Sequence, residues 1–253
     1  MKSNALSQGA TRTKFVVNCG LLIAISIVLK ILFEMYIPLG GFPSLRLNLT
    51  ALPIMFSGIV LGPVAGFVVG FISDLLCFFI KPAGPFFIGF TLAMGFTGMI
   101  PGLIWRFLKK REIKHLEWFN LAFIAVAAAI LIFTGIFTVK DGTVYYGENA
   151  LNPLLLILLA LLMLAYVLYP IFVVRRSHGL STGYRSDYLL FTVSISQLVT
   201  SIILNTWFLT ILYGQAVTVL LPARIVTNVF LIPLYTIALA GLLKALARFV
   251  STR

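Results

Sequence analysis

The sequence predicts an all-α integral membrane protein, and three observations indicate this fold class. Of the 253 residues, 60% are hydrophobic and only 10% are charged, so water is not the main solvent of the chain. Apolar runs of about 20 residues recur along the sequence, which is the length that a membrane-spanning helix needs. No window shows the alternating pattern of a barrel strand, and lipid tolerates long apolar segments only as helices.

Glycine, proline and charged clusters divide the apolar sequence into about eight membrane spans. The predicted spans are 15–37, 50–62, 64–80, 88–108, 117–139, 151–174, 187–213 and 223–247. The second and third are short for a full crossing and are separated only by Gly62-Pro63, which suggests a tilted or broken hairpin. The polar, basic start precedes a long apolar run without a small-residue cleavage site, so we expect a retained first helix and not a signal peptide.

The distribution of lysine and arginine predicts that both termini lie in the cytoplasm. With the N-terminus inside, 14 of the 19 basic residues fall at cytoplasmic ends of spans. These 14 are Lys2, Arg12, Lys14, Arg106, Lys109, Lys110, Arg111, Lys114, Arg175, Arg176, Arg185, Lys244, Arg248 and Arg253. The same basic residues at span ends account for the net charge of +12. No nucleic-acid partner is expected, because the basic tracts lack any groove-entering or RNA-binding motif. The segment 140–152 lies outside and is interpreted as a solvated connector.

Three cations run against this trend and gather at the outer ends of spans, namely Arg46, Lys81 and Arg224. Such a group suits an anionic ligand. The alternative is that these side chains anchor the protein by reaching the lipid headgroups. Binding is favoured for Arg224, which lies just inside a span after Pro222, and the two interpretations stay open for the other two cations.

Polar side chains also mark the last two spans. Gln197, Ser201 and Asn205 are spaced by four residues, so one helical face should be polar and line a cavity or a helix interface. Asn228 lies one turn inside the next span. Amides carry both a donor and an acceptor, as recognition of a heterocyclic ring edge requires, although hydrogen bonding between helices would also use them. Trp207 either stacks on a flat ring or belongs to the aromatic belt at the interface.

Asp74 is an acid inside the third span, where an unpaired acid costs about 2.5 to 3.5 kcal/mol. It must therefore face protein or water. It either contacts amines of a ligand or pairs with a cation such as Lys81 or Lys30, and structural pairing is favoured.

Small residues recur at a spacing that permits close approach of helices. Glycines stand at positions 58, 62, 66 and 70, and Gly98 with Gly102 repeats the spacing in the fourth span. Packing inside the bundle is favoured over a partner surface for these glycines. Gly20 and Ala24 have the same spacing in the first span, where the smooth strip suits a partner helix.

Catalytic patterns are missing from the sequence. There is no phosphate-binding GxxxxGK[ST], no HExxH and no serine or cysteine with a plausible base nearby. His115 and His178 fall in basic cytoplasmic loops, and Cys19 and Cys77 lie in different spans without metal-ligand spacing. We therefore expect no enzymatic activity, no cofactor, no metal and no disulfide, and ATP hydrolysis, if required, must come from another chain.

Three stretches together resemble the folate family of substrate-binding (S) components of energy-coupling factor (ECF) vitamin transporters. The first is LRLNL at 45–49 followed by Leu52-Pro53-Ile54. The second runs from Gly62-Pro63 through Ser73-Asp74 to GPFFIGFTL at 84–92 and GMIPG at 98–102. The third and most specific is LNTWFLTILYG at 204–214 with LLPARIVTN at 220–228 and Ile232-Pro233.

The resemblance implies a single membrane domain over 1–253, whose six-helix core is formed by 15–110 and 187–247. Residues 115–176 are then an inserted helical pair, which preserves the topology because two crossings restore the side. The family captures a vitamin from outside a bacterial cell membrane and docks on a membrane coupling (T) subunit driven by two ATPase subunits. Its AxxxA docking motif is represented here by Gly20-x-x-x-Ala24.

A folate ligand would present a flat pterin to aromatic and amide groups and its carboxylates to cations. The residues that match these needs, and that the resemblance implies as ligand-binding, are Arg46, Lys81, Asn205, Trp207, Arg224 and Asn228. The leading function is therefore binding of folate or a related anionic vitamin such as pantothenate. A stand-alone secondary transporter should show inverted repeats, and none is visible. An intramembrane enzyme based on Asp74 would lack a partner acid or a metal.

Overall fold

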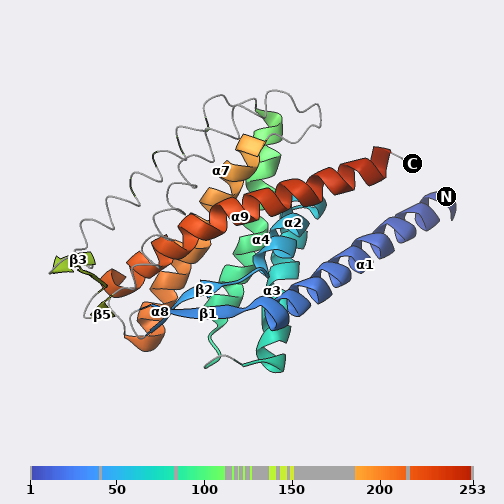
Figure 1. The fold of residues 1–253 in the computed structure, drawn as a ribbon. Helices are drawn as coiled ribbons and strands as arrows, with labels where there is room; N and C mark the ends of the chain where they lie inside the picture. Colours follow the sequence, from blue (N-terminus) through green and yellow to red (C-terminus); the bar gives the residue numbers. More distant parts are fainter. Residues whose placement is uncertain are drawn as a thin grey trace. The chain divides into compact units, whose positions relative to one another are not determined.

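The computed structural model describes residues 2–39, 42–82, 85–111, 116, 119, 122, 126, 137–140, 143–146, 149–150, 186–214 and 217–251 (Figure 1). The chain divides into two compact units. The first unit comprises Met1–Glu34 and Asn48–Phe107. The second comprises Met35–Leu47 and Leu108–Arg253.

Four helices build the first unit: α1 (Lys2–Phe33), α2 (Ala51–Leu61), α3 (Pro63–Ile80) and α4 (Ile88–Lys110). Helix α1 packs against α2 and α3, and α2 packs against α3. A small hydrophobic core joins them and contains Cys19, Ile54, Ala65 and Val69. The helices form because the segments are continuously apolar, so that the backbone must satisfy its hydrogen bonds internally.

Glycines allow α4 to approach α2 and α3 closely. A Cβ atom added to Gly58 or Gly66 would overlap the carbonyl of Gly98, and one added to Gly102 would lie 2.5 Å from the carbonyl oxygen of Gly58. The predicted packing of these glycines inside the bundle is therefore confirmed. Gly62 has another role, because it separates α2 from α3 with φ 108°, a backbone conformation that glycine adopts without a steric penalty.

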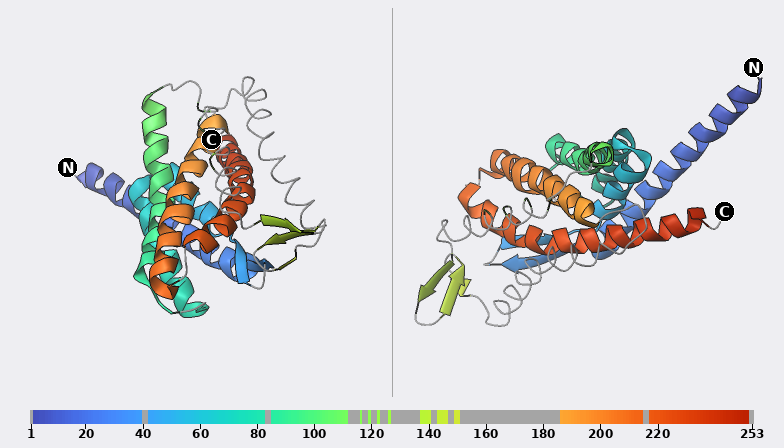
Figure 2. Two further views of the ribbon diagram at one scale, coloured as in Figure 1. Left: turned by 90° about the vertical axis from the view of Figure 1, so that its left-hand side faces the viewer. Right: turned by 90° about the horizontal axis from the view of Figure 1, so that it is seen from above.

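A helix of three parts and a second long helix dominate the other unit. α7 (Ser186–Gln197), the π-helical turn η1 (Leu198–Leu204) and α8 (Asn205–Tyr213) follow one another without a break. Gly214 ends α8 in the left-handed conformation, with φ 62°, as the predicted Tyr-Gly turn requires. α9 (Val217–Ser251) packs against α7, η1 and α8, and the ribbons run side by side in Figure 2.

An antiparallel pair of strands, β1 (Met35–Leu39) and β2 (Phe42–Leu47), replaces the expected end of the first span. The prediction that this span reaches residue 37 is wrong, since α1 ends at Phe33. Pro38 explains the change, because proline disrupts a helix interior but is tolerated where the strand register shifts, between Ile37 and Leu39. Strand β2 packs against α9.

A second antiparallel sheet occupies the predicted outer connector. Its strands are β3 (Phe137–Lys140), β4 (Thr143–Tyr146) and β5 (Asn149–Ala150), in that order. The predicted span 117–139 therefore ends too late, because strand pairing begins at Phe137. Of its earlier part, the structure describes helical positions at Phe119, Ala122 and Val126. The predicted span 151–174 and His178 lie outside the described residues.

The predicted helical membrane fold is confirmed for the described part of the chain. Among the described residues, five helical segments are long and apolar enough to cross a membrane, and α2 is a shorter apolar helix. The five are Thr13–Phe33, Pro63–Ile80, Ile88–Lys110, Asp187–Leu212 and Arg224–Leu246. Together with α2 they correspond to the six predicted core spans. The two small sheets are an addition that was not predicted.

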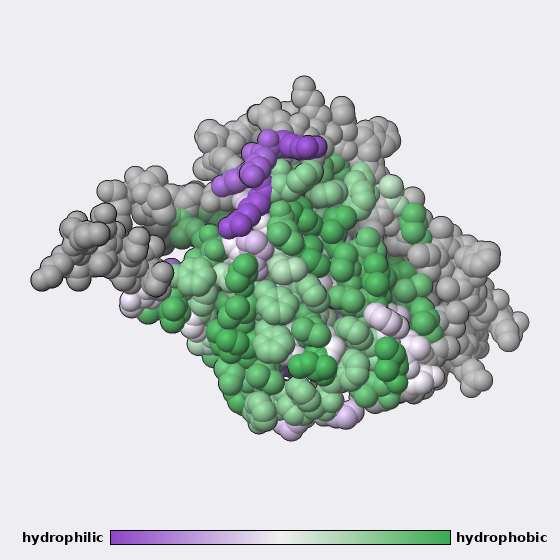
Figure 3. Space-filling model, turned by 180° about the vertical axis from the view of Figure 1, so that it is seen from behind, coloured by the Kyte–Doolittle hydropathy of each residue, from purple (hydrophilic) through white to green (hydrophobic). Residues whose placement is uncertain are grey.

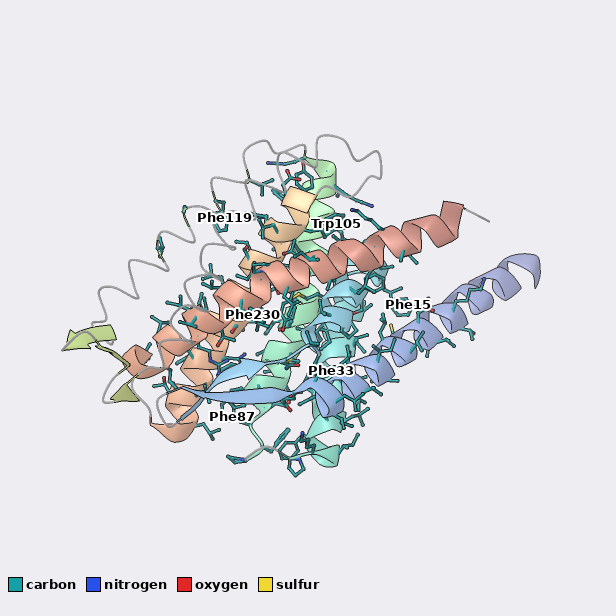
Figure 4. The ribbon with its side chains drawn as sticks, in the orientation of Figure 1. Phe15, Phe33, Phe87, Trp105, Phe119 and Phe230 are labelled. Carbon is teal, nitrogen blue, oxygen red and sulfur yellow. The ribbon has the colours of Figure 1, made fainter. Side chains whose placement is uncertain are left out.

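Exposed hydrophobic side chains give these helices a surface suited to lipid. Figure 3 shows a face covered largely by hydrophobic residues, with hydrophilic residues gathered mainly at one edge. On α1, exposed apolar side chains extend from Phe15 to Phe33, both of which are labelled in Figure 4. Contact with hydrocarbon stabilises such a surface, whereas contact with water would not.

Candidate functional site

The polar centre of the second unit is a contact between Asn228 of α9 and Ser201 of η1. Asn228 is only 1% exposed. Its Nδ2 donates hydrogen bonds to Ser201 Oγ at 2.9 Å and to the carbonyl oxygen of Arg224, one turn earlier, at 2.7 Å. Within the described part of the chain, no group donates to the buried Oδ1 of Asn228. These three residues, which we call the Asn228 cluster, leave one acceptor for a further partner.

The π-helical turn sets where Ser201 lies around its helix. The backbone N–H of Asn205 donates to the carbonyl of Thr200, five residues earlier, instead of four as in an α-helix. The prediction that Gln197, Ser201 and Asn205 lie in one straight line along an α-helix is therefore wrong, because residues four apart are not aligned in a π-helical turn. The expectation of a helix interface is confirmed for Ser201, because it contacts α9. Such turns occur frequently at functional sites.

Other polar groups belong to the same unit. Arg224 is partly buried and begins the apolar span of α9. Asn205 is partly buried at the start of α8, which packs against α9. Thr206 is 3% exposed, and its Oγ1 has no hydrogen-bond partner among the described residues. A cation and several hydrogen-bonding groups thus occur on helices that pack together, an arrangement that can recognise a polar, anionic molecule.

The remaining predicted ligand residues have different surroundings. Arg46 is in β2, opposite Tyr36, and this strand packs against α9. Trp207 is 59% exposed and stacks on Phe208 with ring centroids 5.8 Å apart, a position that fits the aromatic belt. Lys81 is exposed at the end of α3, in the first unit. The structure thus places Arg46, Asn205, Trp207, Arg224 and Asn228 in one unit and Lys81 in the other.

Asp74 forms an ion pair inside the first unit. Its Oδ1 lies 3.3 Å from Lys30 Nζ, and the two side chains are 16% and 8% exposed. Thr91 Oγ1 of α4 donates to Asp74 Oδ2 at 2.9 Å. The favoured structural pairing is confirmed, and the partner is Lys30. The role of Thr91 was not predicted. The available signal was a threonine hydroxyl in the otherwise apolar sequence of one span, which could bond to the acid in the span before it.

None of the described residues covers the small-residue strip on α1. Gly20 and Ala24 are both exposed, and a Cβ atom added to Gly20 would meet nothing within 4 Å. Val28, the next residue on the strip, is 52% exposed. Cys19, by contrast, is a buried free thiol on the face of α1 that joins the core. The helix therefore has one face that packs in its own unit and another that the described residues leave exposed.

The fold and the site define a helical, multi-pass membrane protein with a buried polar cluster between its last two apolar segments. Residues 10–167, more than half of the chain, match the family described as "ECF-type riboflavin transporter, S component". The chain belongs to this family of ECF transporter S components, so it is a component of a membrane transporter, and the predicted resemblance to S components is confirmed. The matched range extends into the predicted inserted pair, 115–176.

A curated relative has a different vitamin in its name. The folate transporter FolT of Clostridium novyi (strain NT) is 32% identical over 99 residues, which make up 39% of this chain. The match covers 56% of the length of that relative. The names of the family and of the relative both refer to a vitamin transporter, and they differ in the vitamin that they give.

Proposed function

We propose that this chain is the substrate-binding subunit of an ECF-type importer, which captures a vitamin at the outer face of the cell membrane and delivers it through separate ATP-driven subunits. Membership of the S component family supports this function. The observation that carries the proposal is the Asn228 cluster, because a buried amide whose oxygen has no donor among the described residues, one turn inside the apolar span of α9, is suited to hold a ligand. Both termini then lie in the cytoplasm, as the lysine and arginine bias favours.

The proposed ligand is folate or a related anionic vitamin. Arg224 and Arg46 are cations associated with the same helix, since the strand of Arg46 packs on α9. Cations of this kind recognise carboxylates through charge-assisted hydrogen bonds. Asn205, Trp207 and Asn228 are assigned to the pterin ring, and the role of Lys81, which belongs to the other unit, stays a prediction from the sequence. The similarity to a folate transporter supports this assignment.

Riboflavin is the second candidate, and the family description favours it. Riboflavin has no carboxylate, so its binding would not require cations at the outer end of α9. The contribution of Arg224 to affinity therefore distinguishes the two ligands.

The test is a titration of the purified Arg224→Ala variant with folate. We expect the affinity to fall by about 1.5 to 3 kcal/mol, or about 10- to 150-fold, the range for a hydrogen bond to a charged group. Asn228→Ala should also bind more weakly. Arg106→Ala is the matched control, because Arg106 is an exposed arginine near the cytoplasmic end of α4. Unchanged folate affinity in Arg224→Ala, or binding of riboflavin alone, would reject the folate assignment.

The exposed strip of Gly20 and Ala24 is the proposed docking face for the membrane coupling subunit. Replacing Ala24 or Gly20 with Trp should leave vitamin binding near normal and abolish uptake, because a bulky side chain prevents close approach of a partner helix. Gly241→Trp is the control, since Gly241 is an exposed helical glycine on α9 with open space around its Cα. Normal uptake and copurification of the coupling subunit by Gly20→Trp would place docking on another surface.

A further inference from the structure

We infer that Ser201 is a positioning residue, which together with the Arg224 carbonyl holds the Asn228 amide so that only its acceptor faces the ligand. The ligand group at this point must then be a hydrogen-bond donor, such as a ring N–H or an amino group. The inference rests on the proposed function, in which Asn228 belongs to the vitamin site, and it adds the chemistry that Asn228 selects.

The Asn228 amide uses both of its hydrogen-bond donors inside the protein. A side-chain amide has two N–H donors and one carbonyl acceptor. Both donors of Asn228 are used, one to Ser201 Oγ at 2.9 Å and one to the Arg224 carbonyl at 2.7 Å. Asn228 therefore has no donor left for a ligand, and it cannot contribute an N–H to a carboxylate.

The hydrogen-bond partners fix the orientation of the Asn228 amide. The oxygen and the nitrogen of a side-chain amide have nearly the same size and geometry, so only their hydrogen-bond partners show which atom is which. A backbone carbonyl only accepts, and the atom 2.7 Å from the Arg224 carbonyl oxygen must therefore be nitrogen. Rotating the amide would bring two acceptors together. The orientation is consequently fixed by chemistry.

This orientation leaves the buried oxygen of Asn228 as the group that can meet a ligand. Asn228 is 1% exposed, and its Oδ1 receives no hydrogen bond from the described residues. Buried acceptors without a donor are uncommon in folded proteins because the lost hydration is not replaced. A ligand donor would supply the missing bond, whereas a ligand without one would leave the oxygen unpaired. This asymmetry makes the position selective.

The place of Ser201 in the π-helical turn suits it to this positioning role. It lies inside η1, where hydrogen bonds span five residues, so its angular position differs from that in an α-helix. Helix α9 packs directly against this turn. Ser201 provides the second acceptor that keeps the amide from turning about its own axis, and it acts through Asn228 without needing to touch the ligand.

Both candidate vitamins offer suitable donors, so the test does not depend on which of them binds. A pterin has an amino group and a ring N–H along one edge, and the flavin ring has an N3–H. The matched probes are folate against its 2-desamino-2-methyl and N3-methyl analogues, and riboflavin against 3-methylriboflavin. Each comparison removes one donor and retains most of the molecule.

The experiment is equilibrium titration of the purified full-length chain and four variants with these probes. In the unmodified protein we expect at least one analogue to bind about tenfold more weakly than its parent vitamin. In Asn228→Ala, the ratio of the affinity for the parent vitamin to the affinity for its analogue should fall close to one. Ser201→Ala should reduce the ratio to about threefold, and Ser201→Thr, which keeps the hydroxyl, should restore it. Ser194→Ala removes another buried serine hydroxyl from the same helix and should leave the ratio unchanged.

The outcomes separate the inference from the proposed function. A ratio that is the same in Asn228→Ala as in the unmodified protein would overturn the inference while vitamin binding stands. A ratio lowered equally by Ser194→Ala and Ser201→Ala would show a general packing effect and would also overturn it. Failure of the unmodified chain to bind either vitamin would overturn the proposed function and the inference together.

Discussion

Replacement of Asp74 by Asn tests whether the ion pair in the first unit holds its helices together. Asp74 Oδ1 and Lys30 Nζ are 3.3 Å apart, which corresponds to a Coulomb attraction of about 5 kcal/mol at an effective dielectric constant of 20. Desolvation of both charges opposes this attraction. The relevant comparison is therefore removal of one partner, which leaves a buried charge unpaired and costs about 3 to 5 kcal/mol.

The hydrogen bond from Thr91 is a much smaller effect. Asparagine keeps an acceptor for Thr91 Oγ1, so Asp74→Asn removes the charge and can retain this bond. Hydrogen bonds between membrane helices contribute about 0.6 kcal/mol on average. Thr91→Val is consequently the control that measures the hydrogen bond alone, and its effect should be several times smaller than that of Asp74→Asn.

The assay is reversible unfolding of the purified protein in detergent, arranged as a double-mutant cycle with Lys30→Met. We expect each single variant to lose about 3 kcal/mol, and the double variant to lose at least about 1 kcal/mol less than the sum, because the two residues interact directly. Additive effects, or single effects no larger than that of Thr91→Val, would refute the claim that this pair links α1 to α3.

Two further predictions concern packing and the inserted segment. Gly66→Ala should destabilise the protein by about 1 to 3 kcal/mol in the same unfolding assay, because the new methyl group overlaps the Gly98 carbonyl. Gly241→Ala should have no such effect, because no described atom lies within 4 Å of the added methyl group. Equal stability of the two variants would contradict the packing. Replacing 117–174 with a short polar linker should preserve the sidedness of both termini and measurable vitamin binding, checked by accessibility labelling and titration. A deletion that inserts normally but binds no vitamin would assign the segment to the site.

The apolar spans were predictable because their signal is the cost of placing polar backbone in lipid. That cost depends on composition over about 20 residues, so the core spans could be located without knowledge of their packing. The break at Gly62-Pro63 was also predictable, since glycine and proline together interrupt a helix. The Lys30–Asp74 pairing was one of the options that the sequence left open, and the fold decides among them by bringing Lys30 close.

The two small sheets were missed although the sequence contains their signals. Gly40-Gly41 stands between Leu39 and Phe42, which are opposite in the register of β1 and β2. Asp141-Gly142 stands between Lys140 and Thr143, which are opposite in β3 and β4. Both dipeptides are strong signals for two-residue hairpin connections. Averaging hydrophobicity over long windows conceals such short elements at the ends of spans.

The detail of the Asn228 cluster could not be predicted from the sequence. A spacing of four residues between Gln197, Ser201 and Asn205 has its expected meaning only in an α-helix, and composition does not indicate a π-helical turn. The sequence likewise shows an amide with a donor and an acceptor. Only the packing of α9 on η1 reveals that both donors of Asn228 are used.

Vitamin binding by the purified chain without any partner subunit is the measurement that tests the proposed function most directly. The vitamin that copurifies would be identified, and folate and riboflavin would be titrated against the chain, first alone and then as Arg224→Ala and Arg106→Ala. We expect the chain alone to bind folate or a related anionic vitamin tightly. Arg224→Ala should weaken this binding and Arg106→Ala should not. Uptake should occur only when the coupling subunits are present. Uptake by the chain alone, or failure to bind any vitamin, would contradict the proposed function.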